Sequence, residues 1–195
     1  MRALNVSIEK SVVVVVEGID DRIVFEFFCQ KWNINNIQFV SLNTKADFDS
    51  VSAVVRLPGF DETVRTFAIL RDADNNFGSA KQSVEDILRR LSLRIKTDFF
   101  ILPDNRNTGM LETLLMGSIS GDASRVGCID AFIECLHNKS VDIPEHRKDK
   151  AKTYAFLSAF DEPGKRIGEA TQAGYWNSDN KIFNPLKEFF KKLVE

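Results

Sequence analysis

Residues 11–21 read SVVVVVEGIDD, and this stretch decides the fold. Its five consecutive valines form an unbroken β-branched run, which is typical of a strand buried on both faces, as in a parallel sheet. Gly18 breaks the run, and apolar residues at positions 23, 24, 27 and 28 then follow a helical repeat. The stretch therefore predicts a buried strand, a turn, and a helix capped by Asp20 or Asp21.

A second stretch, FAILRDADNN at residues 67–76, has the same character, because an apolar run stops abruptly at carboxylates. In an open α/β sheet, the carboxyl ends of parallel strands border one crevice in which ligands bind. We therefore expect the acidic residues of both stretches to converge there, although about fifty residues separate them in the chain. Four hard oxygen ligands in one crevice favour a divalent cation, Mg²⁺ before Mn²⁺. The four residues are Glu17, Asp21, Asp72 and Asp74.

The rest of the chain continues the alternation of strands and helices. Strands are predicted at residues 37–42, 66–70 and 98–102, and helices at 46–56, 61–65, 79–93, 124–138, 145–159 and 185–194. The first hundred residues thus predict a doubly wound α/β fold, with a mostly parallel, Rossmann-like sheet of four strands flanked by helices. We expect a core over residues 1–117 and a helical C-terminal extension over residues 118–195, packed together as one compact unit.

Composition limits the classes of function. The formal net charge of −2 and the pI near 5.8 argue against binding of nucleic acid by bulk positive charge, but they do not exclude a nuclease, whose metal site itself adds negative charge. Three irregularly spaced cysteines, a Met1 that opens no signal peptide, and no long apolar run predict a cytoplasmic protein without membrane contact. Two histidines are too few for a typical zinc site, and the 16 phenylalanines are expected in the core.

The acidic motifs resemble those of the Toprim domain. Glu17-Gly18 with Asp21, followed by Asp72 and Asp74 at the end of a later strand, matches its Glu-Gly and Asp-x-Asp pattern residue for residue. The family includes topoisomerase and primase domains, OLD-type nucleases and a recombination mediator. The resemblance implies a Toprim-like fold and Mg²⁺-dependent hydrolysis of phosphodiester bonds, on DNA rather than RNA.

A narrower resemblance covers nearly the whole chain. The segment LPDNRNTGMLETLL, residues 102–115, and the closing GYWNSDNKIFNPLKEFF look like segments of an uncharacterised, stand-alone, Toprim-like bacterial family. One departure is Asn76, which stands where many Toprim enzymes carry a third acidic residue. The chain is also too short to carry the rest of a topoisomerase or a primase.

The carboxylates have alternative roles. Glu17 either ligates the metal or acts as a general acid or base, together with the metal-binding and catalytic Asp72 and Asp74. Asp21 is either a further ligand or an acidic residue of the first helical turn, where the helix dipole favours it. Glu112 would be a fifth ligand, or a structural residue at the third helical position if Gly109 caps that helix.

A nuclease also needs cations for the phosphate backbone. The predicted nucleic-acid contacts are Arg71, Arg106, Lys148, Lys150 and Lys152, although such mixed-charge segments are more often solvated helix faces. Three aromatic residues, Tyr154, Tyr175 and Trp176, either stack on bases or pack in the core.

Other readings of the sequence fit less well. A haloacid-dehalogenase-like phosphatase would carry its Asp-x-Asp on the first strand, and a dinucleotide-binding protein would carry Gly-x-Gly-x-x-Gly after it. We therefore expect a metal-dependent nuclease. The alternative is a non-catalytic Toprim-like module that binds nucleic acid or a partner ATPase, as the recombination mediator does.

Overall fold

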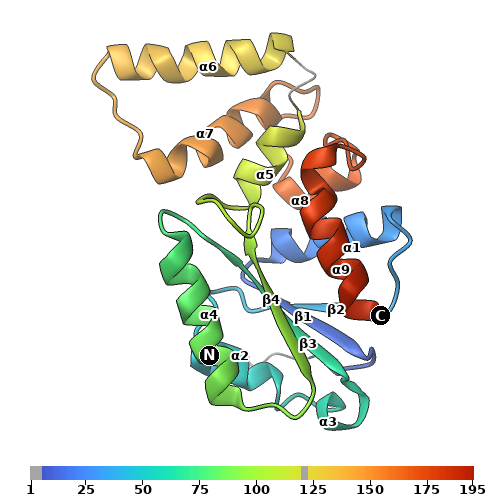
Figure 1. Cartoon of the computed structure of the whole chain (residues 1–195). Coiled ribbons are helices and arrows are strands. Elements are labelled where there is room, and N and C mark those ends of the chain that lie inside the picture. Colours follow the sequence, from blue (N-terminus) through green and yellow to red (C-terminus); the bar gives the residue numbers. More distant parts are fainter. Residues whose placement is uncertain (1–5, 120–122) are drawn as a thin grey trace.

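The computed structural model describes residues 6–119 and 123–195 and places a parallel four-stranded sheet at the centre of the molecule (Figure 1). The strand order is β2-β1-β3-β4, and every neighbouring pair is parallel. The strands are β1 (Val12–Val16), β2 (Ile37–Ser41), β3 (Thr66–Asp72) and β4 (Lys96–Leu102). The expectation about Met1 concerns residues 1–5, which lie outside the described part of the chain.

The valine run is central because helices cover both faces of the sheet. Val13 and Val15 pack into one core, and Val12, Val14 and Val16 into the other, with at most 3% of any of them exposed. An unbroken apolar strand is what a sheet with two covered faces requires. Three helices cover the first face, namely α2 (Phe48–Val54), α3 (Phe60–Thr63) and α4 (Phe77–Leu91).

The second face carries the larger core, to which the last part of the chain contributes. Phe190 contacts Phe25 and Phe39, with ring centroids 5.9 and 5.5 Å apart. Phenylalanine therefore fills much of this core, as its abundance predicts. The elements that build it include α1 (Ile19–Lys31), α5 (Leu111–Ser118), α8 (Ile167–Gln172), the 3₁₀ turn η1 (Lys181–Phe183) and α9 (Asn184–Val194).

A helical hairpin, α6 (Ala123–Asn138) and α7 (Glu145–Ser158), stands beyond α5, on the side of the sheet where the strands end (Figure 1). Thr113 on α5 donates a hydrogen bond to Asp149 on α7 at 2.6 Å. The Lys152 ammonium lies 2.7 Å from the Asp130 carboxylate and joins the two helices of the hairpin. The hairpin is thus held over the edge of the sheet that the sequence predicts to bind a ligand.

The predicted fold class is confirmed, because the chain forms a parallel four-stranded sheet flanked by helices, with a helical C-terminal segment. Two predicted helix starts are wrong. Gly18, not Asp20 or Asp21, is the N-cap of α1, and Met110, not Gly109, is the N-cap of α5. Across the described residues, no helix combines the length and the apolar character needed to cross a membrane.

Candidate metal and phosphate site

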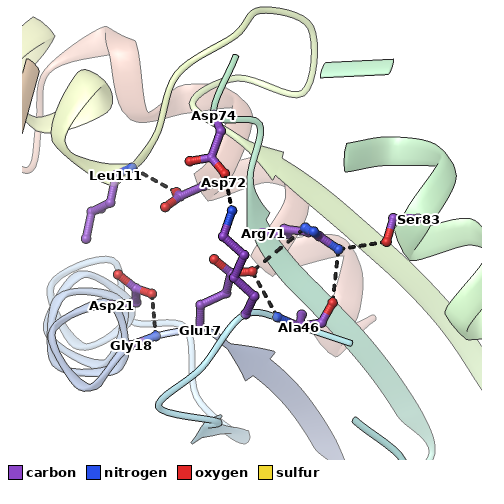
Figure 2. A network of polar contacts seen from close by, with 10 residues as sticks. Glu17, Gly18, Asp21, Ala46, Arg71, Asp72, Asp74, Ser83 and Leu111 are labelled. Carbon is purple, nitrogen blue, oxygen red and sulfur yellow. Dashed lines mark hydrogen bonds and ion pairs between the residues drawn. The ribbon is translucent and has the colours of Figure 1, made fainter. Parts of the chain in front are cut away.

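A crevice of about 570 Å³ lies at the carboxyl edge of the sheet, and all five predicted metal-ligating residues line it. They come from the ends of β1 and β3, from the starts of α1 and α5, and from the loop after β3. Figure 2 shows four of these carboxylates around a common space. The five residues are Glu17, Asp21, Asp72, Asp74 and Glu112.

Glu17 follows β1 directly and is held by two groups from outside that strand. Its Oε1 accepts a hydrogen bond from the Ala46 backbone N–H at 2.9 Å and lies 3.8 Å from the Arg71 Nε (Figure 2). Burial raises the pKa of Glu17, against the lowering effects of the Ala46 N–H and the Arg71 charge. A carboxylate with a raised pKa, in a fixed orientation, is suited to exchanging a proton.

Asp21 sits in the first turn of α1 and turns back toward its start. Its Oδ2 accepts a hydrogen bond from the Gly18 N–H at 2.7 Å, so the residue acts as the acidic member of a capping interaction (Figure 2). Burial raises the pKa of Asp21, and the nearby charge of Glu17 raises it further. The structural role considered for Asp21 is therefore present, and the residue still lines the crevice.

Asp72 is the last residue of β3, two residues beyond the predicted end of that strand. Its Oδ1 accepts a hydrogen bond from the Leu111 N–H at the start of α5, at 3.1 Å (Figure 2). Burial raises the pKa of Asp72 well above its usual range, and four neighbouring carboxylates add to the effect. The negative charges of the crevice therefore act together against ionisation of Asp72.

Asp74 reaches the same crevice because the backbone changes direction after β3. Alternate residues of a strand point to opposite sides, but Asp74 has φ +51°, in the left-handed region. Its backbone N–H and C=O exchange two 2.9 Å hydrogen bonds with Gly109, which anchors the loop before α5. The Asp74 Oδ2 lies 2.8 Å from the Lys45 Nζ, and this contact raises the pKa of the lysine.

Glu112 is buried, with 7% of its surface exposed, and occupies the second position of α5 instead of the predicted third. Thr113 holds the third position and accepts a hydrogen bond from the Met110 N–H at 3.0 Å. Burial raises the pKa of Glu112, while the Lys150 ammonium, 3.8 Å away, opposes the shift. Burial of a carboxylate whose cationic partner is 3.8 Å away costs free energy, and a purely structural role at the start of a helix would not require that cost.

The oxygen donors of the crevice are of the kind that binds a hard divalent cation. The side chains, however, do not surround a common position for such an ion. Among the described residues, no three His, Cys, Asp or Glu side chains stand so that they could hold a metal ion as they are. Each crevice carboxylate instead faces its own N–H group or ammonium. Oxygen ligands from Asp and Glu are those that Mg²⁺ prefers.

The predicted nucleic-acid contacts divide into two groups. Lys150 lines the crevice. Arg71 instead donates hydrogen bonds to the Ala46 carbonyl and to Ser83 Oγ. These bonds hold its guanidinium beside the Glu17 carboxylate, 3.8 Å away. Arg106 is exposed in the loop after β4, and Lys148 and Lys152 pair with Glu145 and Asp130 away from the crevice.

The crevice wall also carries three cationic residues beyond the five predicted contacts, namely Lys45, Arg147 and Arg166. Lys45 could have been found, because it follows β2 at the same edge of the sheet. Arg166 precedes α8 and pairs with Asp20 at 3.0 Å, a contact between residues 146 positions apart. No local pattern predicts such a contact.

Comparisons with known proteins agree with this fold. Residues 11–195 match the family described as "Protein of unknown function (DUF3226)". No curated protein matches the chain. The C-terminal region of the Burkholderia pseudomallei OLD protein is similar in structure, with a TM-score of 0.52 and 13% sequence identity, over 96% of this chain and 100% of that one. At that identity the likeness establishes the fold alone, so membership of the Toprim family stays a prediction.

Proposed function

We propose that this chain, which belongs to the DUF3226 family, is a nuclease that hydrolyses phosphodiester bonds with the help of Mg²⁺ or Mn²⁺. The observation that carries the proposal is the set of five carboxylates in one crevice, four of them with raised pKa values. Repulsion among so many buried negative charges destabilises the folded state unless a bound cation neutralises them.

Residues of the crevice divide the chemistry among them. A divalent ion bound by Asp72 and Asp74 would activate water and neutralise charge on the phosphate. Glu17, fixed by Ala46 and Arg71, is the group best placed to exchange a proton. Lys45 and Lys150 would bind phosphate oxygens, because both ammonium groups line the crevice.

Two likenesses support this choice of chemistry. The Glu-Gly and Asp-x-Asp motifs resemble those of OLD-type nucleases, and the fold is similar to that of an OLD protein region. The wall of the crevice also carries Arg147 and Arg166, which add positive charge that attracts a polyanion.

The test is cleavage of plasmid and single-stranded DNA with Mg²⁺ or Mn²⁺, by the wild type and by Glu17→Gln and Asp74→Asn. We expect both variants to lose at least about 100-fold in rate. Asp61→Asn, an exposed carboxylate on α3 outside the crevice, is the matched control and should cut normally. Cutting that survives both crevice substitutions would come from a contaminant and would end the proposal.

Metal binding has its own readout. Addition of Mg²⁺ should raise the Tm of the wild type, since a ligand that binds only the folded state stabilises it, and should raise that of Asp74→Asn less. An equal rise in both proteins would place the ion elsewhere.

A second candidate is a non-catalytic module that binds nucleic acid or a partner ATPase. It is favoured by the separate partners of the carboxylates, since every one of them is already engaged within the described structure. A mobility shift on DNA without metal, with no cleavage under any condition, would support this candidate over the nuclease.

A further inference from the structure

Tyr154 on α7 borders two hollows of different character. It lines the acidic crevice, and it also lines an apolar groove of about 680 Å³ between α6 and α7. With 49% of its surface exposed, its ring is available to a ligand that enters either hollow. The two hollows therefore meet at an aromatic side chain.

The other two aromatic residues considered for base stacking pack against aromatic rings of the protein itself. Tyr175 stacks on Phe160, with ring centroids 3.9 Å apart, and Trp176 is buried against Phe156 at 5.2 Å. Of the three residues, Tyr154 is therefore the one that is half exposed.

The groove beyond Tyr154 has the size and surface to take a flat, apolar group. Phe132 on α6 is 50% exposed, and Ile129 lies on the same wall. Ala151 and Ala155 on α7 form the opposite wall, where their small side chains leave the space open. A nucleobase presents such a flat face whatever its sequence.

Cationic side chains line the same crevice as Tyr154. Arg147 and Lys150 precede it on α7 at spacings of seven and four residues, which places all three on one face of the helix. Arg166 adds a third positive charge to the same wall. Positive charges beside an exposed aromatic ring are complementary to a strand that offers both phosphates and bases.

On the basis of the proposed function, we propose that the substrate is a single-stranded segment of nucleic acid. Its scissile phosphate lies at the carboxylates, the neighbouring phosphates lie at Arg147, Lys150 and Arg166, and one unstacked base lies on Tyr154 at the mouth of the groove. A paired base inside a duplex has no free face for the ring. The net charge of −2 likewise argues against holding two backbones by bulk positive charge.

The experiment measures binding rather than cleavage. An oligodeoxynucleotide of about ten nucleotides, long enough for one such binding site, is labelled with fluorescein for anisotropy or carries 2-aminopurine as a stacking probe. It is titrated with the whole protein in Ca²⁺ as a single strand and as a duplex. The variants are Tyr154→Ala and Tyr154→Phe, and the control is Val141→Ala, which removes an equally exposed apolar side chain of the hairpin outside the groove.

We expect the single strand to bind more tightly than the duplex and to quench 2-aminopurine. Tyr154→Ala should weaken binding by about 5- to 150-fold and abolish the quenching, because stacking on one ring is lost. Tyr154→Phe, which keeps a ring, and Val141→Ala should both bind within about two-fold of the wild type. Thermal unfolding of each variant verifies that it is folded.

Equal binding of duplex and single strand, or full binding by folded Tyr154→Ala, would overturn the inference. A dimer that Tyr154→Ala dissociates would also overturn it, since a second copy would then occupy the groove. These failures differ from failure of the proposed function. Tyr154-dependent binding without cleavage contradicts only the nuclease, and metal-dependent cleavage confined to duplex contradicts only the single-strand substrate.

Discussion

At the scale of single residues, Asp72 carries the strongest electrostatic conflict of the site. Its carboxylate caps α5 through the Leu111 N–H while four other carboxylates surround it. Asp72→Asn keeps the Oδ1 acceptor and removes the charge. Without divalent ions at pH 8, we expect this variant to have a higher Tm than the wild type, by about 2–4 °C for each kcal/mol gained. Asp61→Asn is the control and should not raise the Tm, because the helix dipole favours an exposed carboxylate in the first turn of α3.

The raised pKa values also set the direction of a pH effect. Glu17, Asp21, Asp72 and Glu112 hold protons in the folded state at pH values where the unfolded chain has lost them. Their contribution to the free energy of unfolding therefore falls as pH rises from about 4 through the raised values, and is constant above them.

Urea unfolding at a series of pH values, without divalent ions, measures this fall. Asp47 and Asp104 have lowered pKa values and act in the opposite direction, so the informative quantity is the difference between the wild type and Asp72→Asn. We expect a shallower fall in the variant. Parallel curves would mean that Asp72 titrates normally.

Gly109 is a second residue on which the site depends. It has φ +136°, and a Cβ there would lie 2.7 Å from Thr113 Oγ1. We expect Gly109→Ala to cost about 1–3 kcal/mol in the free energy of unfolding and to weaken metal binding, because it displaces the start of α5 from Asp72. Gly127→Ala, on α6 with nothing within 4 Å, should be neutral or stabilise by up to about 1 kcal/mol. Equal effects of the two substitutions would contradict this account.

At the scale of elements, α9 is the helix whose loss would open a face of the sheet. Phe190 is fully buried against α1 and β2, so Phe190→Ala should lower the free energy of unfolding by about 3–5 kcal/mol, as measured in urea. Lys191→Ala, one residue further on and partly exposed, should change it by less than about 0.5 kcal/mol. A small effect at Phe190 would mean that α9 is dispensable for the core.

The elements also show which features the sequence could predict. The valine run and the amphipathic α4 carry strong local patterns, so the sheet, its helices and the convergence of Glu17 with Asp72 were predictable. The helix α8 was not predicted. It has six residues and is held by tertiary contact, since a Cβ at Gly168 would lie 2.9 Å from Ile23 on α1. Cations such as Arg166 therefore reach the crevice through packing rather than through local sequence.

At the scale of the whole molecule, the three cysteines report on global opening. Cys29 is buried, and burial raises its thiol pKa to about 12, whereas Cys128 and Cys135 are exposed on α6. Because the thiolate is the reactive form, we expect Ellman's reagent to titrate two thiols quickly and the third only on unfolding. Rapid reaction of all three in the native protein would show that the core around α1 opens locally.

The position of α9 on the second face of the sheet affects how the protein is made. Translation delivers all four strands before it delivers Phe190 and Leu193, which cover their apolar side chains. A ribosome that pauses before residue 193 therefore holds a nascent chain in which part of this phenylalanine-rich core is uncovered. The second cover of the sheet is therefore complete only when that helix leaves the exit tunnel, and until then the growing polypeptide exposes an apolar surface that favours aggregation.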